Sequence, residues 1–391
     1  MSKLFITGSE AAALGAKLAR IEVLAYYPIT PAFPAMERLS KYIEDGELNA
    51  RFIRAESDHS ALAAVLGGSL AGARCYTVTN SQGLLLMTEV VYHTAGLRQP
   101  VVMGVANRAL SAPHSRFPEH GDAVSQDASG WIQLFCENNQ DVLDNTIQAF
   151  RLAEELRTPV MVNYEGYIQS HTLEEVAAPD QAGADAFLPL VRRPALDVER
   201  PQGVNTVTSP EFYPSYKYSQ NEAALKALTL IPAIAAAYNR SFAAASCGLL
   251  EAYRMEEAEH AVVAMGSVVA TSRILVDELR KQGKKIGLIK VQTWRPFPAE
   301  ALLRLLQNVR YTTVLDKNII FGVGGALAND LKAAAYGRLH TVINGAILGL
   351  GGSPCGAREI KEALEQTEKS EGGGNRSVWI GSDPPAGGTK R

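Results

Sequence analysis

Helix-like and strand-like segments alternate along this chain, and the alternation constrains its fold more than any other feature. Residues 23–27, 75–80 and 101–106 are short apolar runs with the length of buried strands. Between them, residues 59–73 and 84–95 carry the small and apolar residues of packed helices. A helix between two strands returns the chain to the same edge of the sheet, so such strands run parallel. The pattern therefore predicts a parallel α/β sheet.

The pattern continues for one more unit and then stops. We expect a helix over 146–156 and a strand over 159–163. From 173 to 214 the periodicity fails and Pro and Asp become frequent, which is typical of a long connector that wraps another surface. A helix over 221–238 follows, so we assign residues 1–245, connector included, to the first domain.

A second block of the same kind begins near residue 249. It predicts a second, smaller α/β domain over 246–368, with strands at 261–265, 286–291, 312–315 and 341–343 and helices at 269–282, 298–307 and 325–336. Residues 369–391 are rich in Gly and Pro and cannot bury enough apolar area to order themselves alone. We expect this tail to be flexible or to lie on a partner.

Composition excludes several classes of protein. A hydrophobic content of 47%, a charged content of 20% and a net charge of −3 indicate a globular chain without the basic excess of a nucleic-acid binder. No apolar run is long enough to span a membrane, and the N-terminus lacks the pattern of a signal peptide, so we expect a cytoplasmic location. The four cysteines are far apart with no CxxC pair. We therefore expect no metal site in this chain, and any redox metal must sit on another chain.

Thr30 lies between two prolines just past the end of the first predicted strand, in the segment Tyr27-Pro28-Ile29-Thr30-Pro31. Open α/β sheets bind their ligands at this edge. Because the prolines fix the backbone, the Thr30 hydroxyl is suited to donate to a substrate carboxylate or carbonyl. The alternative is a proline-rich turn with an incidental threonine.

Glu56 and Asp58 stand at the start of a predicted helix, where the helix dipole favours ionised carboxylates. Capping alone could explain them. The helix that follows is rich in Ala and Gly, however, so it can pack closely and present its first turn to an interface. The start of this helix, with Glu56 and Asp58, is thus a candidate for an interface as well as for capping.

Two further turns point to the same edge of the sheet. Ser81, Gln82 and Gly83 join a strand to a helix, a placement in which free N–H groups can meet an anion or a cofactor. Arg108 ends the next strand and can clamp a carboxylate with two parallel hydrogen bonds, although a structural ion pair is the alternative. We expect Thr30, Asp58, Ser81 and Arg108 to share one edge.

Phosphate-binding motifs are missing from the chain. It contains no GxGxxG opening a βαβ unit, no GxxxxGK[ST], and no GDG followed some distance later by NN, the diphosphate–magnesium signature of thiamine enzymes. If the predicted edge serves a thiamine cofactor, another chain must hold the diphosphate.

Several blocks in order along residues 1–365 carry a specific resemblance: YPITP at 27–31, ESDHSALAA at 56–64, NSQGL at 80–84, ANRALSAP at 106–113, VAMGSVVATS at 263–272, GLIKVQTWRPFP at 287–298 and LDKNIIFGVGG at 315–325. At these positions the chain resembles the α subunit of the 2-oxoacid:acceptor oxidoreductases, the family of pyruvate:ferredoxin oxidoreductase. The resemblance implies a pyrimidine-type thiamine-diphosphate-binding domain, then a transketolase C-terminal-like domain.

The resemblance also implies cofactors and partners. Thiamine diphosphate would be shared with a diphosphate-binding β subunit, while Mg²⁺ and 4Fe-4S clusters would sit on partner chains, including γ-type and ferredoxin-like subunits. Coenzyme A and ferredoxin, or another electron acceptor, would take part in the reaction. The expected assembly is a dimer of heteromers.

Carried over by position, Thr30 and Arg108 would contact the 2-oxoacid. Ser81, Gln82 and Gly83 would line the cofactor, and Asp58 would face N1′ of its aminopyrimidine. The family usually has glutamate there, and aspartate is one methylene shorter. Either the cofactor sits closer, a water intervenes, or Glu56 takes the task.

The segment after Arg108 also departs from the family. His114, Arg116 and His120 make it more polar and basic than in relatives that use pyruvate, so His114 and Arg116 are candidate substrate contacts. Such a loop would suit an aromatic 2-oxoacid such as phenylglyoxylate, or one with a second carboxylate, unless it is simply a solvated surface loop.

Three functions stay open from the sequence. The leading one is a CoA-acylating 2-oxoacid oxidoreductase subunit, working with its partners. The others are a transketolase-like or 2-oxoacid dehydrogenase subunit that passes the carbon fragment to lipoamide, and a non-catalytic paralogue that has lost the site.

Overall fold

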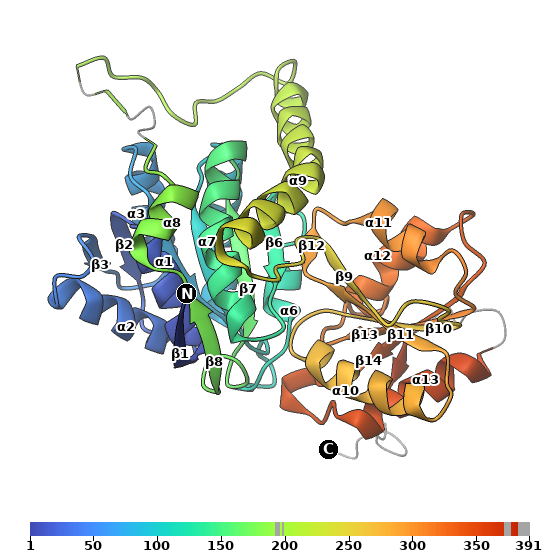
Figure 1. Ribbon diagram of the computed structural model, residues 1–391. Helices are drawn as coiled ribbons and strands as arrows, with labels where there is room; N and C mark the ends of the chain where they lie inside the picture. The colour runs from blue at the N-terminus through green and yellow to red at the C-terminus, as the bar shows by residue number, and fades with distance from the viewer. Residues whose placement is uncertain (192–195, 198, 371–376, 382–391) are drawn as a thin grey trace.

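The computed structural model describes residues 1–191, 196–197, 199–370 and 377–381, which form two large sheets side by side (Figure 1). The first has the strand order β12-β6-β7-β5-β4-β2-β3. Its strands are β2 (Val23–Tyr26), β3 (Arg51–Arg54), β4 (Cys75–Thr79), β5 (Val102–Asn107), β6 (Ile132–Phe135), β7 (Val160–Glu165) and β12 (Thr293–Arg295). All neighbours are parallel except β12 and β6. The predicted parallel α/β fold is confirmed.

Helices cover both faces of the first sheet. One face packs on α1 (Gly8–Leu18), α2 (Phe33–Glu44) and α7 (Asn139–Leu156), and the other on α3 (Asp58–Leu70) and α5 (Thr88–Gly96). Because both faces are covered, β4 and β5 are buried along their whole length. This explains why these strands are continuous apolar runs in the sequence rather than alternating ones.

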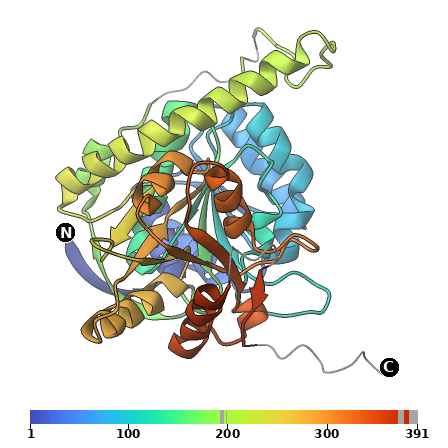
Figure 2. The same ribbon diagram turned by 90° about the vertical axis from the view of Figure 1, so that its right-hand side faces the viewer.

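The segment between the domains contains more regular structure than the sequence predicts. β8 (Leu173–Ala178) pairs antiparallel with β1 (Ser2–Thr7), and α8 (Gln181–Phe187) follows it. The predicted helix at 221–238 belongs to the longer α9 (Tyr213–Phe242), whose first turns stand clear of the body in Figures 1 and 2. β1 and β8 are distant in sequence, so no local pattern could reveal their pairing.

The second sheet has the strand order β15-β14-β13-β10-β11-β9. Its strands are β9 (Leu250–Tyr253), β10 (His260–Ala264), β11 (Ile286–Val291), β13 (Tyr311–Asp316), β14 (Val342–Ile347) and β15 (Val378–Trp379). One face packs on α11 (Ala299–Leu306) and α12 (Ala326–Ala335), the other on α10 (Val268–Lys281) and α13 (Ala357–Lys369). This second core domain is confirmed as α/β.

Two details differ from the predicted domain plan. β12 lies within the predicted second domain but pairs with β6 of the first sheet. β15 lies within the predicted flexible tail but pairs with β14, because a short Val-Trp segment can extend an open sheet edge. The rest of the tail beyond 370, apart from 377–381, lies outside the described residues. The boundaries at 245 and 368 stay predictions.

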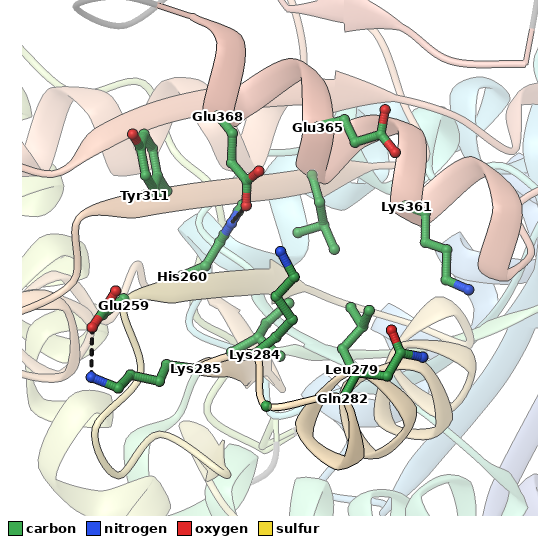
Figure 3. A pocket seen from close by; sticks show the side chains of 13 residues that line it. Glu259, His260, Leu279, Gln282, Lys284, Lys285, Tyr311, Lys361, Glu365 and Glu368 are labelled. Atoms are coloured by element: carbon green, nitrogen blue, oxygen red, sulfur yellow. Dashed lines mark hydrogen bonds and ion pairs between the residues drawn. The ribbon is translucent and has the colours of Figure 1, made fainter.

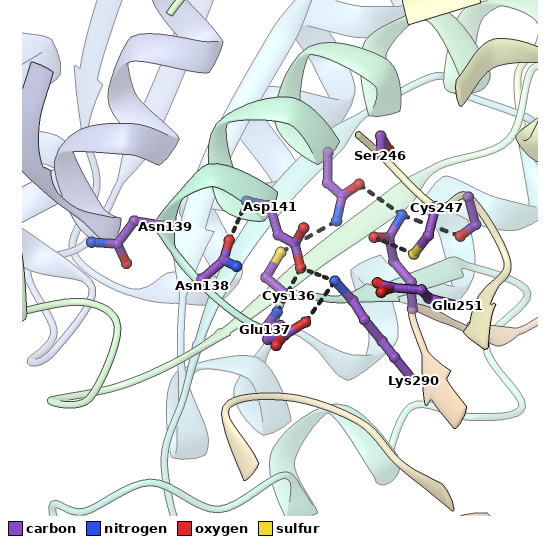
Figure 4. Close-up of polar contacts among 12 residues, drawn as sticks. Cys136, Glu137, Asn138, Asn139, Asp141, Ser246, Cys247, Glu251 and Lys290 are labelled. Atoms are coloured by element: carbon purple, nitrogen blue, oxygen red, sulfur yellow. Dashed lines mark hydrogen bonds and ion pairs between the residues drawn. The ribbon is translucent and has the colours of Figure 1, made fainter. Parts of the chain in front are cut away.

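A buried ionic cluster joins the two halves of the chain (Figure 4). Lys290 of β11 contacts Asp141 in the first turn of α7 at 2.6 Å and Glu137, just before that helix, at 3.0 Å. Arg273 of α10 donates to Glu137 and to Glu251 of β9, each at 2.7 Å. Since these groups are largely buried, the cluster fixes the second sheet against the first.

Among the described residues, no helix is long and apolar enough to cross a membrane.

Candidate active site at the carboxyl edge of the first sheet

Parallel pairing brings the ends of β2, β4 and β5 to one edge of the first sheet. Thr30 follows β2, Ser81 follows β4 and Arg108 follows β5. Asp58 begins α3, which packs beside β2 and β4. The structure thus brings together the four residues that we expected to share an edge.

Asp58 is buried, with 3% of its surface exposed, just behind the turn that opens α4 (Ser81–Leu86). The Thr79 hydroxyl donates to its carboxylate at 2.8 Å. A Cβ atom at Gly83 would lie 2.6 Å from the same carboxylate, so only glycine leaves room there. Burial raises the pKa of Asp58 to about 6, because no cation in the described part of the chain offsets the loss of hydration. The carboxyl can therefore hold or release a proton near neutral pH.

Glu56 differs from its neighbour. It is exposed, and it accepts a hydrogen bond from the Ser60 hydroxyl, which lowers its pKa. The cap of α3 is Ser57, whose hydroxyl accepts from the Ser60 amide at 3.2 Å. The structure thus places Glu56 on the surface at the helix start, whereas Asp58 is buried between Thr79 and Gly83.

Arg108 joins two of the predicted site segments. Its guanidinium donates to the main-chain carbonyl of Thr30 at 2.5 Å and to the Gln82 side chain at 3.1 Å. The arginine is only 7% exposed, and its Nε is buried without a hydrogen-bond partner among the described residues. No carboxylate is paired with the guanidinium there, so the alternative of a structural ion pair does not hold. The group retains a free donor and its charge for a ligand.

The Ser81 turn is held by contacts that the sequence does not reveal. Its amide donates to Asp122 at 2.9 Å, and its hydroxyl donates to the Ala109 carbonyl at 2.6 Å. The Gln82 side-chain oxygen also lies 2.6 Å from the Ser81 hydroxyl, whose single proton serves one of the two oxygens at a time, and it accepts from Arg108. Asp122 was not among the predicted site residues, since a lone aspartate in a polar segment carries no distinguishing signal.

The polar loop after Arg108 runs between the two halves of the molecule. His114 and Arg116 are exposed, and His114 lies 3.1 Å from the Ser111 hydroxyl. Further along, Glu119 accepts from the amide of Gly351 in the second domain at 3.1 Å. Burial raises the pKa of Glu119 to about 7. The loop is therefore anchored at its end by the second domain, while His114 and Arg116 face solvent.

Beneath this loop lies a second buried ionic contact between the halves. Glu165, at the end of β7, pairs with Lys317 after β13 and with His120 at 3.0 Å. The Ser267 amide and hydroxyl also donate to Glu165, at 3.0 and 2.8 Å. These four side chains bring the carboxyl edges of both sheets together below the predicted substrate loop.

A cavity of about 550 Å³ lies elsewhere, at the amino ends of β10, β11 and β13 (Figure 3). His260 and Glu368 face one another in it, and Lys284 points into the space beside them. None of the predicted site residues lines this cavity. Within the described ranges, no three His, Cys, Asp or Glu side chains are grouped as metal ligands would be.

Comparison with known proteins identifies both halves. Residues 14–247 match the family model "Pyruvate flavodoxin/ferredoxin oxidoreductase, thiamine diP-bdg", and residues 258–360 match "Pyruvate:ferredoxin oxidoreductase core domain II".

Curated relatives align over nearly the full chain. The pyruvate synthase subunit PorA of Methanothermobacter thermautotrophicus is 43% identical over 96% of this chain and 97% of its own. PorA of Thermotoga maritima is 39% identical over 93% and 94%. The ketoisovalerate oxidoreductase subunit VorA of Pyrococcus horikoshii is 37% identical over 94% of each chain.

A solved structure shares the fold. The 2-oxoglutarate:ferredoxin oxidoreductase from Magnetococcus marinus, described with 2-oxoglutarate, coenzyme A and succinyl-CoA bound, superposes with a TM-score of 0.75 at 18% identity. The match covers 93% of this chain and 65% of that longer chain. Together with the family models and the curated relatives, this shows that the chain belongs to the family of 2-oxoacid:ferredoxin oxidoreductase α subunits.

Proposed function

We propose that this chain is the α subunit of a thiamine-diphosphate-dependent enzyme that converts a 2-oxoacid and coenzyme A to an acyl-CoA and CO₂. The two electrons released leave one at a time through iron–sulfur clusters on partner subunits, to ferredoxin or another acceptor. The observation that carries the proposal is that one sheet edge holds a buried carboxyl, Asp58, and a buried guanidinium, Arg108, and that neither has an ion-pair partner among the described residues.

The residues at this edge fit the aminopyrimidine half of thiamine diphosphate. Asp58 is buried and uncompensated, as a group that shares a proton with a ring nitrogen must be. Because Gly83 has no side chain, the Asp58 carboxylate can be approached. Buried polar atoms of Asn80 and Gln82 have no hydrogen-bond partner among the described residues. When bound, the cofactor supplies a nucleophilic carbon and an electron sink.

The residues of this chain then have separate tasks. With the cofactor bound, the Asp58 carboxyl would share a proton with the pyrimidine ring, which its raised pKa permits near neutral pH. The free Nε of Arg108 donates to the 2-oxoacid carboxylate, and its other two nitrogens keep the guanidinium in place on Thr30 and Gln82. The hydroxyl of Thr30, an exposed residue, donates to the substrate carbonyl or carboxylate.

The loop that carries His114 and Arg116 bears on the choice of 2-oxoacid. Its positive charge near Arg108 favours a substrate with a second carboxylate, or an aromatic one such as phenylglyoxylate, over pyruvate alone. The curated relatives named above are subunits of a pyruvate synthase and of a ketoisovalerate oxidoreductase, which supports a 2-oxoacid without fixing its side chain.

The proposed partners follow from what the chain lacks. It has no diphosphate–magnesium motif and no cluster-ligating cysteine pattern, so a β subunit would hold the diphosphate and Mg²⁺ and other subunits the 4Fe-4S clusters. We expect a dimer of such heteromers. The non-catalytic alternative rested on aspartate at position 58, and the burial and raised pKa of that residue argue against it.

The experiment is 2-oxoacid-dependent reduction of a viologen dye by the assembled complex, with coenzyme A, over pyruvate, 2-oxoisovalerate, 2-oxoglutarate and phenylglyoxylate. We expect reduction with at least one acid, and acyl-CoA as its product. Transfer to lipoamide instead of coenzyme A would favour the dehydrogenase alternative. The isolated chain should not bind thiamine diphosphate tightly, and Mg²⁺-dependent binding near micromolar affinity would contradict the shared site.

A further inference from the structure

Asp122 is a buried carboxylate that the proposed chemistry does not use. We propose that it is a positioning residue that fixes the cofactor turn at Ser81 and the substrate-binding Arg108 relative to one another. The proposal rests on the function proposed above and names what makes the site rigid. Asp122 lies at the start of α6 (Gly121–Val124), beyond the substrate loop, and is completely buried.

The contacts of Asp122 use both of its oxygens. Oδ2 accepts from the Ser81 amide at 2.9 Å and from the Arg108 amide at 3.0 Å. Oδ1 accepts from the Asn107 side chain at 2.9 Å and from the Ala123 amide at 2.8 Å. All four donors are neutral, and one oxygen joins the two segments that carry the site. Because both amides meet the same atom, neither segment can shift without breaking a hydrogen bond in a buried place.

The strand pairing shows why such a link is needed. β4 and β5 are in register from Tyr76–Val102 to Thr79–Val105, and the described pairing ends there. Beyond it, no β4–β5 pairing holds Ser81 and Arg108 to one another, although β5 stays paired with β7 as far as Asn107. Asp122 takes the place of the ladder, since its carboxylate bridges the two main chains just where the strands stop pairing.

The backbone of Ser81 supplies a second, independent observation. Its φ is +47°, in the left-handed region that non-glycine residues seldom adopt. Such a conformation persists only when its surroundings hold it. Here the Asp122 carboxylate holds the amide and the Ala109 carbonyl holds the hydroxyl. A loss of Asp122 would therefore release the turn as well as the arginine.

The test uses Asp122→Asn in the assembled complex. Asparagine has nearly the same shape, but it has one acceptor oxygen, and its amide group opposes two of the four donors. At saturating thiamine diphosphate we expect kcat/KM for the 2-oxoacid to fall about 100-fold, with KM rising because Arg108 is misplaced. In the apo complex, calorimetry should show a thiamine diphosphate Kd about 10-fold higher, a readout that does not need turnover.

A double-mutant cycle separates positioning from general damage. If Asp122 acts through Arg108, adding Asp122→Asn to Arg108→Ala should lower kcat/KM by no more than about threefold beyond Arg108→Ala, at saturating cofactor. Effects that multiply in full would overturn the proposal. So would an unchanged kcat/KM and cofactor Kd in Asp122→Asn. Activity of the wild-type complex on its 2-oxoacid is measured first, so failure of the proposed function is seen separately.

Asp144 offers a matched control in the same domain. It is 3% exposed, lies on α7 and accepts from the Tyr238 hydroxyl at 2.8 Å. Asp144→Asn should leave kcat/KM and cofactor Kd unchanged within about twofold. Should Asp122→Asn fail to assemble, Asn107→Leu removes only one of the four donors. It should give a smaller loss with the same coupling to Arg108, and full additivity with Arg108→Ala would again count against the proposal.

Discussion

At the carboxyl edge of the first sheet, the buried carboxylates Asp58 and Asp122 are surrounded by neutral donors, whereas between the two sheets Glu137 and Glu165 are held by lysine and arginine. Asp58 accepts from a threonine hydroxyl, and Asp122 from amides. Glu137 instead contacts Arg273 and Lys290, and Glu165 contacts Lys317. The two regions bury the same chemical group in opposite electrostatic surroundings.

The pKa values follow these surroundings. Burial raises the pKa of Asp58 and of Asp122, because hydrogen bonds from neutral groups do not replace the lost hydration. Burial acts on Glu165 in the same direction, but Lys317 and His120 outweigh it and hold the pKa of Glu165 below its usual range. The pKa of Glu137 is likewise lowered by Arg273 and Lys290.

The difference separates proton chemistry from docking. A carboxyl whose pKa lies near 6 can gain and lose a proton during turnover, so Asp58 is suited to acid–base work. A carboxylate paired with a buried cation does not take up a proton so readily. It opposes separation of the two sheets, because separation would leave both charges without a partner. The carboxyl group thus has a proposed role in proton transfer at one edge, while at the interface it joins the two sheets.

The largest expected effect is that of Asp58→Ala on activity. Removing the proton-sharing carboxyl should lower kcat about 1000-fold or more, with the complex still assembled. The measurement is viologen reduction, together with proton exchange at thiamine C2 followed by NMR after acid quench.

Glu56→Gln is the matched control and should keep activity within about twofold, since Glu56 is an exposed residue at the helix start. Asp58→Glu tests the position of the carboxyl group. It should retain substantial activity if the position of the cofactor compensates for the shorter side chain of the native aspartate. Normal C2 exchange in Asp58→Ala with slow exchange in Glu56→Gln would reverse the two roles.

The next effect is on stability, from Lys317→Met. The change leaves Glu165 buried without its cation, so the free energy of unfolding should fall by about 3–5 kcal/mol. Denaturant unfolding checks this. Adding Glu165→Gln to Lys317→Met should restore part of the loss. If the single variant is as stable as wild type, the stability of the buried interface carboxylates does not depend on their cations, and the two regions do not differ as described.

A smaller effect is expected for Arg108→Ala. Loss of a charge-assisted contact to the 2-oxoacid carboxylate should cost about 2–4 kcal/mol of transition-state binding, roughly 30-fold to 1000-fold in kcat/KM. Steady-state kinetics on the intact complex measure it. A kcat/KM within threefold of wild type would show that the substrate carboxylate binds elsewhere.

Local sequence patterns were sufficient for the strands that are buried on both faces. The predicted positions match to within a few residues for β4, β5, β7, β10 and β11, which are short apolar runs, each next to a helix in the sequence. The polar-edged β3, the short β12 and the β1–β8 pair were not predicted. Each depends on pairing between distant segments, which no local window contains.

The candidate site divides in the same way. Thr30, Ser81 and Arg108 could be placed together because parallel strands end at one edge, a rule that needs only the strand order. Asp122, Glu119 and Lys317 could not, because they reach the site from a loop and from the second domain. The separation of Glu56 from Asp58 also needed the structure, since both lie at the same helix start in the sequence.

The last and smallest effect is a difference of sign in the pH dependence of stability. For Asp58 the native pKa of about 6 lies above the unfolded value of 3.8, so the native state binds more protons and the free energy of unfolding falls as pH rises from about 4 to 6. Asp58→Asn lacks this proton, so its free energy of unfolding should rise by about 2 kcal/mol relative to that of wild type across that range.

For Glu165 the native pKa lies below the unfolded value of 4.5, so its contribution to the free energy of unfolding is complete above that value and is lost as pH falls. Relative to wild type, Glu165→Gln should therefore become less stable as pH rises from about 3 to 5. Denaturant unfolding of the three proteins at matched pH values would show curves that diverge in opposite directions, and curves of the same sign would mean that both carboxylates occupy one kind of environment.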